Sequence, residues 1–497
     1  MRPSQRINVH PSDHGAEDLK TKTYDVICLG SGWAGRVLSA RIVKAGYTAV
    51  IVENELVGGD CPFWACVPSK VLLRSPEVLQ AAQDVGGARE RTQTGTGVDV
   101  AATFKRRDAI TRNWDDSAGL IPMIEGNGVS IVRGTGKIVG EKQVQVSPHT
   151  GEPFTLTARL AVGLCTGSEP IIPDVPGLRE ADPWTPRDAT SAEEVPAHLI
   201  IIGAGVVGCE MATAYIGYGA KITMIGRSGS ILTNMDDEAG LIVQKALESK
   251  GVKFLLNKEI KAVDRKASDK VVITFSSGDS VTGTEILVTT GRTAKLDQLG
   301  LETVGAQQSG RFIKVDESLC VKTNSGRWLY GAGDINGRAP LTHSSKYHGA
   351  IAANAILTEA NGSHKADSSD WSSTAATADH YAVPQVIFTD PPIASVGLTR
   401  KSAKAKGIKV REVTAPLSSP GYMIHSDKPS DSWAQWLLDD EERLLGATFV
   451  GTDAAELLHA STVAVVGGVK LGRLMHAIPS FPSLSWVYYN LMDAAGV

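Results

Sequence analysis

The chain has 497 residues, of which 42% are hydrophobic and 21% are charged, and its formal net charge is −4. A chain of this length exceeds the size of one ordinary core, so we expect about three domains. The charge provides no large basic field, and no stretch approaches about 18 uninterrupted apolar residues, so we expect neither nucleic acid nor a membrane as a partner. Six cysteines are too few for a disulfide scaffold, which favours a reducing, cytoplasmic setting.

Residues 1–22 mix Asp, Glu, His and Lys without an apolar segment, and are predicted to be a flexible tail and not a secretory signal. Residues 24–53 then predict a strand, a tight turn, a helix and a second strand. A GxGxxG pattern directly follows the first strand, and Glu53 ends the second. Such glycines let the backbone and a helix N-terminus approach a pyrophosphate, while the carboxylate accepts from a ribose diol. The segment therefore predicts a dinucleotide site whose glycines are Gly30, Gly32 and Gly35.

The next segment, GGDCPFWACVPSK at 58–70, places Cys61 and Cys66 five positions apart. No second Cys pair or nearby His completes a zinc site, and the surrounding glycines and prolines fix an unusual backbone that suits two buried structural cysteines poorly. In a reducing compartment a close pair of this kind is more often catalytic than structural. A reactive thiolate needs a positive environment to lower its pKa, and Lys70 is a candidate cation.

A second strand, glycine loop, helix and strand follow at 199–226, with glycines at Gly203, Gly205 and Gly208. Two such folds in one chain imply two dinucleotides. The position that corresponds to Glu53 is Gly226 here, and Arg227 follows it. Because no carboxylate would repel a 2′-phosphate and a guanidinium lies beside its place, the second site favours NADP(H) over NAD(H). The alternative interpretation is that Arg227 is an ordinary surface charge.

Together with four further motifs, these segments resemble the FAD-dependent pyridine nucleotide-disulfide oxidoreductases over about residues 23 to 490. This group includes dihydrolipoamide dehydrogenase, glutathione reductase and mercuric reductase. The stretch 58–70 resembles the family's redox-disulfide signature, and the further motifs are CTGSEP at 165–170, TTGR at 289–292, LYGAGDI at 329–335 and FTDPPIASVGLT at 388–399. The last motif is similar to the opening of the family's dimerisation domain.

The resemblance implies an α/β protein with two Rossmann-like dinucleotide-binding domains and a C-terminal α+β dimerisation domain that makes the protein a homodimer. The FAD-binding domain would comprise residues 23–180 and 295–365, with an NAD(P)-binding domain inserted at 181–294. The dimerisation domain would span 378–497. Composition agrees with a linker at 366–377, because that stretch is rich in Ser, Thr and Ala.

The resemblance also assigns roles to single residues. Cys66 would lie nearer the flavin as the charge-transfer thiolate, and Cys61 would be the outer sulfur that attacks a substrate. Lys70 would lie beside flavin N5 and pair with Glu210, although either residue alone is more often a surface charge. Asp334 would accept from the flavin's ribityl hydroxyl, with a helix cap as the alternative. Further cofactor contacts would come from Gly59, Thr166, Gly167, Ser168, Gly291, Gly333 and His343.

The C-terminus departs from the family. Its disulfide reductases resemble one another in a late HPTxxE stretch, whose His enters the partner subunit's site as acid and base. Aligning FPSLSW with that stretch places Phe481 at the His position and Trp486 at the Glu position, and an alignment on HAIPS places Ile478 there instead. The dyad is absent in both alignments, as is the C-terminal Cys pair of mercuric reductases. Nearby histidines that packing explains better are His459 and His476.

Three functions remain open at this stage. The first is a thiol-active flavoenzyme in which Cys61 attacks a disulfide or another electrophile. The second is a flavin reductase that passes electrons to a quinone, a metal ion or oxygen, with the cysteines as relays or bystanders, and the third is a non-enzymatic flavoprotein. A pocket edged by Trp64, Phe481 and Trp486 would suit a flat apolar ligand, although core packing of these aromatic residues explains them equally well. No resident metal is expected.

Overall fold

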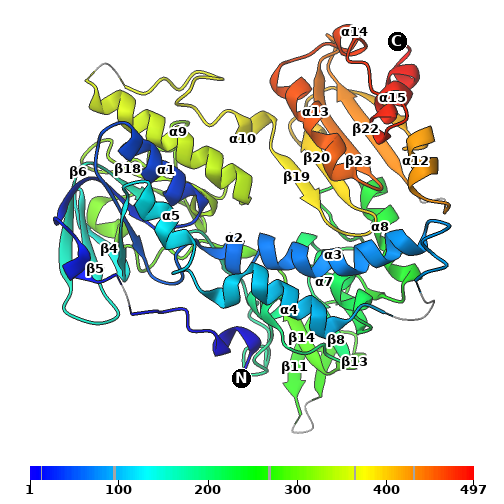
Figure 1. Cartoon of the computed structure of the whole chain (residues 1–497), viewed down its shortest axis with the longest axis horizontal. Coiled ribbons are helices and arrows are strands. Elements are labelled where there is room, and N and C mark those ends of the chain that lie inside the picture. The colour runs from blue at the N-terminus through cyan, green and yellow to red at the C-terminus, as the bar shows by residue number, and fades with distance from the viewer. Residues whose placement is uncertain (13, 93–96, 267–269, 363–364, 429–430) are drawn as a thin grey trace.

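The computed structural model describes residues 1–497 except 13, 93–96, 267–269, 363–364 and 429–430. Figure 1 shows two α/β bodies joined through the long helix α3 (Cys66–Gln83), and a third body of sheet and helices formed by the C-terminal part of the chain. Two Rossmann-like domains and a C-terminal α+β domain were predicted from the sequence, and this architecture is confirmed. Among the described residues, no helix combines the length and the apolar character needed to cross a membrane.

The first domain is built on a seven-stranded sheet. Strands β3, β2, β1 and the C-terminal part of β6 run parallel, and β18 joins β6 on the same sheet. Strands β5 and β4 continue the sheet in antiparallel order. The strands are β1 (Thr23–Leu29), β2 (Ala49–Glu53), β3 (Ser130–Arg133), β4 (Thr135–Gly140), β5 (Gln143–Ser147), β6 (Phe154–Leu164) and β18 (Leu329–Gly331).

Helices α1 (Trp33–Lys44) and α9 (Thr342–Ala360) pack against each other beside this sheet (Figure 1). A glycine permits their close approach, because a Cβ atom on Gly349 would lie 2.4 Å from the backbone oxygen of Ala34. This contact holds the interior of α9 against the first turn of α1, which begins near the end of strand β1, where a parallel sheet of this kind binds its ligands.

Between β2 and β3 the chain forms α2 (Asp60–Phe63), α3, α4 (Val100–Ile110) and α5 (Leu120–Gly126). Two glycines with positive φ precede α2, Gly58 at 132° and Gly59 at 73°. At Gly58 a side chain would also collide with Leu120, whose Cδ1 lies 2.3 Å from the position of a Cβ. The glycine pair of the sequence motif is thus required by backbone conformation and by packing together.

The second domain carries a four-stranded parallel sheet in the order β10-β9-β8-β14 and a three-stranded antiparallel sheet β11-β12-β13. Its helices are α6 (Pro186–Ser191), α7 (Val206–Gly217) and α8 (Asp237–Ser249). The short strands β7 (Glu169–Pro170) and β15 (Arg292–Thr293) pair where the chain enters and leaves the domain. The other strands are β8 (His198–Ile202), β9 (Lys221–Ile225), β10 (Lys253–Leu255), β11 (Ile260–Arg265), β12 (Val271–Phe275), β13 (Ser280–Gly283) and β14 (Glu285–Val288).

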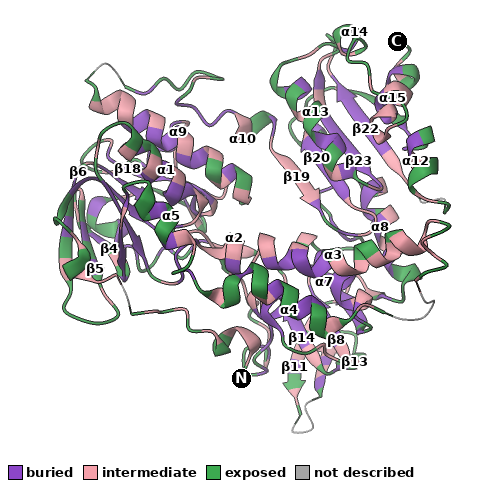
Figure 2. Cartoon of the chain, in the orientation of Figure 1, coloured by how far each residue is buried: buried purple, intermediate pink, exposed green. Residues whose placement is uncertain are grey.

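The third domain has a five-stranded antiparallel sheet in the order β19-β20-β23-β22-β21. Figure 2 shows that β20, β22 and β23 are largely buried, and the fully buried Trp436 lies in β22. The strands are β19 (Pro384–Ile387), β20 (Ile393–Gly397), β21 (Arg411–Ala415), β22 (Trp433–Leu438) and β23 (Leu444–Val450). The helices are α10 (Ala378–Tyr381), α11 (Arg400–Ala405), α12 (Pro420–His425), α13 (Ala454–Val466), α14 (Leu471–Leu474) and α15 (Val487–Ala495).

Two segments predicted to be a tail and a linker make contacts with the domains. In the N-terminal segment, the backbone N–H of Ser4 donates to Asp188 over 3.2 Å, and Arg2 lies 3.0 Å from Asp182 in an ion pair. In the stretch 366–377, Ala366 and Ala376 are buried in the core of the first domain. The remaining short elements are β16 (Gln308–Ser309), β17 (Phe312–Ile313) and the 3₁₀ helices Pro3–Arg6, Ala16–Asp18, Arg112–Trp114, Leu301–Val304, Asp334–Asn336 and Leu484–Trp486.

Candidate active site

The two motif cysteines lie together at the start of α3. Cys66 is the first residue of that helix and Cys61 belongs to α2, and both are half-buried free thiols. The Sγ atom of Cys66 lies 3.0 Å from the hydroxyl oxygen of Thr342, at the start of α9. The N-terminus of α3 adds the positive end of a helix dipole, which stabilises a thiolate.

The two thiols differ in acidity. A hydrogen bond from Cys61 lowers the pKa of Cys66, and further contributions from Thr342 and Lys70 outweigh the opposing effect of burial. The hydrogen bond to Cys66, together with burial, raises the pKa of Cys61 well above its usual range, although hydrogen bonds with Thr342 and Trp33 act in the opposite direction. Cys66 is therefore the thiol that ionises first, and Cys61 donates to it.

Lys70 lies one helical turn after Cys66, and the structure brings it together with Glu210 of α7. The Nζ atom of Lys70 lies 2.7 Å from a carboxylate oxygen of Glu210, whose side chain is 6% exposed. The other carboxylate oxygen accepts a hydrogen bond of 3.0 Å from the backbone N–H of Phe388, and Lys70 lies 4.8 Å from the centroid of the Phe388 ring. A buried carboxylate thus fixes a cation next to the sulfur pair.

The first glycine loop has the geometry of a pyrophosphate cradle. Gly30 has a φ of 99°, and a Cβ there would lie 2.4 Å from the backbone oxygen of Cys165. At Gly35 a Cβ would lie 2.0 Å from the oxygen of Gly30, whereas Gly32, at the start of α1, has open space around it. Glu53 is 9% exposed and accepts from the backbone N–H of Ser31 over 2.8 Å. The residues present therefore fit the adenosine diphosphate half of FAD.

The second glycine loop repeats this packing. A Cβ on Gly203 would lie 2.6 Å from the oxygen of Thr289, and one on Gly208 would lie 2.2 Å from the oxygen of Gly203, while Gly205 has open space around it. Gly226 directly follows β9, and Arg227 after it is exposed. The position that corresponds to Glu53 thus carries no carboxylate here, and a guanidinium follows it directly. Gly291, in the TTGR motif, has a φ of 140° and follows the strand β14.

Residues around the predicted ribityl contact form a polar chain. Asp334 accepts from the Ser168 hydroxyl over 2.7 Å, and Ser168 in turn accepts from the Nε atom of Arg292 over 2.7 Å. Thr166 and Gly167 precede Ser168 in the loop after β6. Gly333, with a φ of 87°, precedes Asp334, and Asp334 is the first residue of a 3₁₀ turn.

A salt-bridge network around Asp60 was not predicted from the sequence. Asp60, at the start of α2, lies 2.8 Å from Arg187 and 2.6 Å from Arg292. Burial alone would raise the pKa of Asp60, but the two guanidinium groups lower it overall. Arg292 could have drawn attention through the TTGR motif, whereas nothing in the sequence around Arg187 connects it with Asp60.

His348 supports the turn that carries Asp334, and the sequence did not indicate this role. It is fully buried on α9, where its Nδ1 accepts from the backbone N–H of Gly333 over 3.1 Å. Its Nε2 therefore carries the proton and donates to Asp379 over 2.8 Å. The predicted His343 is instead exposed on the same helix, with its Nε2 2.8 Å from the backbone oxygen of Pro384.

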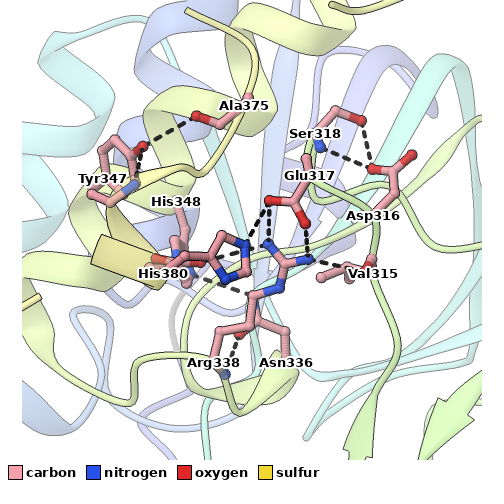
Figure 3. Close-up of polar contacts among 12 residues, drawn as sticks. Val315, Asp316, Glu317, Ser318, Asn336, Arg338, Tyr347, His348, Ala375 and His380 are labelled. Atoms are coloured by element: carbon pink, nitrogen blue, oxygen red, sulfur yellow. Dashed lines mark hydrogen bonds and ion pairs between the residues drawn. The ribbon is translucent and has the colours of Figure 1, made fainter. Parts of the chain in front are cut away.

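Figure 3 shows the charged groups around His348. Arg338 bonds to Glu317 over 3.0 Å, and His380 approaches the same carboxylate over 2.9 Å. Arg338 also lies 3.7 Å from Asp379, whose side chain is 2% exposed. The carboxylate that holds His348 is thereby compensated by a guanidinium, so the buried pair carries balanced charge.

The aromatic residues considered for a flat pocket lie in different surroundings. Trp64 is 3% exposed and its ring centroid lies 6.0 Å from that of Trp114, so it is part of a small core. Phe481 is 65% exposed, and its ring lies 5.1 Å from that of Trp486. Core packing therefore explains Trp64, whereas Phe481 is exposed and packs on a half-buried Trp486. Within the described ranges, no three or more His, Cys, Asp or Glu side chains are grouped to hold a metal ion.

Comparison with known proteins agrees with this geometry. Residues 24–350 match the pyridine nucleotide-disulphide oxidoreductase family, and residues 383–489 match the dimerisation domain of that family. The mercuric reductase of Staphylococcus aureus is 26% identical over 477 residues, which cover 96% of this chain and 83% of the relative. The dihydrolipoyl dehydrogenase of Bacillus subtilis is 28% identical over 482 residues, which cover 95% of this chain and 96% of the relative.

Solved structures show the same fold. The HOCl-induced flavoprotein disulfide reductase RclA from Escherichia coli, in a Cu(II) complex, is 20% identical with a TM-score of 0.79, and the match covers 95% of this chain and 99% of that one. LpdA from Mycobacterium tuberculosis is 23% identical with a TM-score of 0.78 and coverage of 95% and 98%. At these identities the likeness concerns the fold alone.

The acidity of Cys66 gives a first prediction. With the NAD(P)H-reduced protein, the rate of Cys66 alkylation by iodoacetamide, measured by peptide mass spectrometry, should rise with pH through a midpoint at about 6. Lys70→Met should shift that midpoint upward, because it removes a cation that lowers the pKa of Cys66 and leaves the nearby Glu210 charge unbalanced. Lys44→Met, on an exposed residue at the far end of α1, serves as the control. An unchanged midpoint in Lys70→Met would contradict the assignment.

The position of His348 gives a second prediction. His348→Leu removes the acceptor of the Gly333 N–H and leaves Asp379 without its buried donor, so the free energy of unfolding should fall by about 1–3 kcal/mol. Retention of FAD during gel filtration should weaken as well. His348→Gln retains both an acceptor and a donor and should restore most of the loss in urea unfolding and in FAD retention. Equal behaviour of the Leu and Gln variants would refute a hydrogen-bonding role.

Proposed function

The chain belongs to the pyridine nucleotide-disulphide oxidoreductase family, and we propose that it carries two electrons from NADPH through FAD and the Cys61–Cys66 pair to a small disulfide or another thiol-reactive molecule. Like its relatives, it is an FAD-dependent oxidoreductase. FAD, when bound, supplies the chemistry that takes hydride from a nicotinamide and passes two electrons onward. The final acceptor is part of the proposal.

The unequal acidity of the two thiols carries this proposal. Cys66 lies at the N-terminus of α3, within hydrogen-bonding distance of Thr342 and one turn from Lys70, so it holds the negative charge of the reduced pair. Cys61 keeps its proton and is the outer sulfur of the two. Such a pair can attack an external disulfide through Cys61 and then close its own disulfide through Cys66.

The C-terminal segment supports an acceptor that needs little acid and base help. The family's His and Glu dyad is absent whether FPSLSW or HAIPS is aligned with it, so either Phe481 or Ile478 takes the place of the His. General acid–base catalysis of that kind is typically worth about 10²–10⁴-fold. We propose that water or the substrate accepts and supplies the proton in this protein. A substrate whose thiol leaves readily as an anion fits such a site best.

A second candidate is an FAD-dependent reductase of a quinone, a metal ion or oxygen. The exposed ring of Phe481, which packs on a half-buried Trp486, favours it, because flat apolar molecules stack on such rings. The relative from Staphylococcus aureus is named a mercuric reductase, which makes a metal ion a reasonable acceptor to assay. In this alternative the cysteines are not essential.

The nicotinamide and the oligomeric state are further parts of the proposal. Arg227 is exposed next to the second glycine loop, where no carboxylate opposes a 2′-phosphate, which supports NADP(H). Residues 383–489 match a dimerisation domain, which indicates a homodimer. Six cysteines in a chain of this length are too few for a disulfide scaffold, which supports a reducing, cytoplasmic setting.

The nicotinamide preference can be tested by Arg227→Glu. The ratio of kcat/KM with NADPH to that with NADH should fall by about 10–100-fold, because a charge-assisted hydrogen bond to the 2′-phosphate is replaced by repulsion. Lys221→Glu, at the opposite end of β9 and also exposed, should leave the ratio unchanged. A wild-type preference for NADH that Arg227→Glu does not alter would argue against NADP(H).

The use of the cysteine pair can be tested by Cys61→Ser. Anaerobic titration should show roughly four electrons per subunit for the wild type and roughly two for the variant, because only the flavin remains to be reduced. Turnover of a disulfide should be abolished, while transfer to a quinone persists because it requires only access to the reduced flavin. Disulfide turnover at the wild-type rate would instead favour the flavin-reductase function.

A further inference from the structure

Arg36 places an unpaired guanidinium inside the protein. It lies in the first part of α1 and is 8% exposed, and its Nε atom is buried without a hydrogen-bond partner. Burial lowers the pKa of Arg36, and an electrostatic interaction with Cys61 acts in the opposite direction. A buried cation is stable when an anion or several acceptors compensate it. Among the described residues, no carboxylate forms an ion pair with Arg36.

A second cation shares an aromatic neighbour with Arg36. The guanidinium carbon of Arg36 lies 4.4 Å from the centroid of the Trp33 ring, and the Nζ atom of Lys346 lies 5.5 Å from the same ring. Lys346 is exposed on α9 and, like Arg36, has no ion pair in the part of the chain that the structure describes. One indole thus holds two cations that lack anionic partners.

The cluster of Trp33, Arg36 and Lys346 lies beside the outer sulfur. A Cβ on Gly59 would be 3.0 Å from the Cα of Gly32, so the segment that enters α2 packs on the start of α1, next to Trp33. Lys346 lies one helical turn after Thr342, whose hydroxyl contacts the Cys66 sulfur. The Trp33 side chain is also one of the groups that act on the Cys61 thiol, where it lowers the pKa against the larger effects of Cys66 and burial.

The acidic residue next to Cys61 in the chain is already paired with other cations. Asp60 precedes Cys61, and it pairs with Arg187 and Arg292. The approach to Cys61 therefore keeps an excess of positive charge, which would attract an anion and fix its orientation. Arg36 offers fixed donors in a desolvated position, and Lys346 offers a mobile charge at the surface.

We propose that Trp33, Arg36 and Lys346 recognise an anionic substrate, and that the physiological acceptor is a small disulfide bearing carboxylate groups. This inference rests on the proposed function and names its substrate class. In each turnover Cys61 gives its proton to water and attacks one sulfur of the substrate, the S–S bond breaks, and the first thiolate product leaves and takes a proton from water. The Cys66 thiolate then attacks the Cys61 sulfur, releases the second thiolate and closes the Cys61–Cys66 disulfide. The two electrons come from NADPH through FAD.

The first experiment compares three disulfides with identical two-carbon arms in the NADPH-dependent assay. These are 3,3′-dithiodipropionate, bis(2-hydroxyethyl) disulfide and cystamine, which carry two negative charges, no charge and two positive charges. The wild type should favour the dianion. Arg36→Met and Lys346→Met should each lower its kcat/KM by about tenfold or more, mainly through KM, and change the neutral disulfide by less than about twofold. Lys44→Met, on the last turn of α1, is the matched control.

The second experiment measures the anion site without turnover. Reduced holoenzyme is alkylated with iodoacetate or iodoacetamide, which differ in charge and little in size, and modification of Cys61 is followed by peptide mass spectrometry. The rate with iodoacetate divided by the rate with iodoacetamide should be higher for the wild type than for Arg36→Met and Lys346→Met. If neither variant lowers this ratio, the proposal is overturned. It is also overturned if the variants lose kcat/KM equally with all three disulfides.

The two experiments separate this inference from the proposed function. If no disulfide is turned over while the alkylation ratio still depends on Arg36, the anion site stands and the disulfide function fails. Arg36 also lies on α1, whose N-terminus is the predicted pyrophosphate site, so FAD content is measured in every variant. Loss of FAD from Arg36→Met, with an unchanged alkylation ratio, would assign the guanidinium to the cofactor and overturn the proposal.

Discussion

One buried carboxylate connects the three domains of this protein. Glu210 belongs to the second domain, accepts from Lys70 of the first and from the backbone N–H of Phe388, which follows the first strand of the third. A buried carboxylate without partners would be strongly destabilising, so the three groups have to meet for the fold to be stable. The helix that carries Lys70 begins at Cys66, and the same contact therefore fixes where the sulfur pair stands relative to the two dinucleotide loops.

The charge at this contact also gives the two thiols different roles. Lys70 and the N-terminus of α3 act on Cys66, and Thr342 approaches the same sulfur from α9. Once Cys66 is ionised, Coulomb repulsion and the hydrogen bond between the sulfurs keep the proton on Cys61. In family members that have the His and Glu dyad, the His that enters from the partner subunit can remove that proton. Neither alignment of this C-terminus supplies such a dyad, so the proton on Cys61 has to leave by another route.

The sequence could predict the parts of the site that depend on local backbone chemistry. Gly30, Gly35 and Gly203 have to be glycine because a Cβ would meet a backbone oxygen, and such requirements leave a fixed spacing in the chain. The contact of Lys70 with Glu210 joins residues 140 positions apart and was accessible only through the resemblance to a family. The pairing of His348 with Asp379 was not accessible, because it depends on how the segment after α9 folds back, and His343 was selected instead. Trp33 and Arg36 lie in or next to the first glycine motif. That motif requires only its glycines and places no constraint on which amino acid occupies positions 33 and 36.

Arg36 differs from every other buried charge discussed above in how it is compensated. Glu210 has Lys70, Asp60 has two arginines, and Asp379 has His348 and Arg338, so each of these groups is stabilised by the chain itself. The Arg36 guanidinium has an aromatic ring and a sulfur beside it, and its Nε has no acceptor. A cation in this situation is stabilised most when an anion arrives, and we propose that a ligand that reaches the outer cysteine supplies that anion. The free energy that would be needed to bury the charge is then recovered on binding, so discrimination between anionic and neutral acceptors follows from the burial of Arg36 beside Cys61.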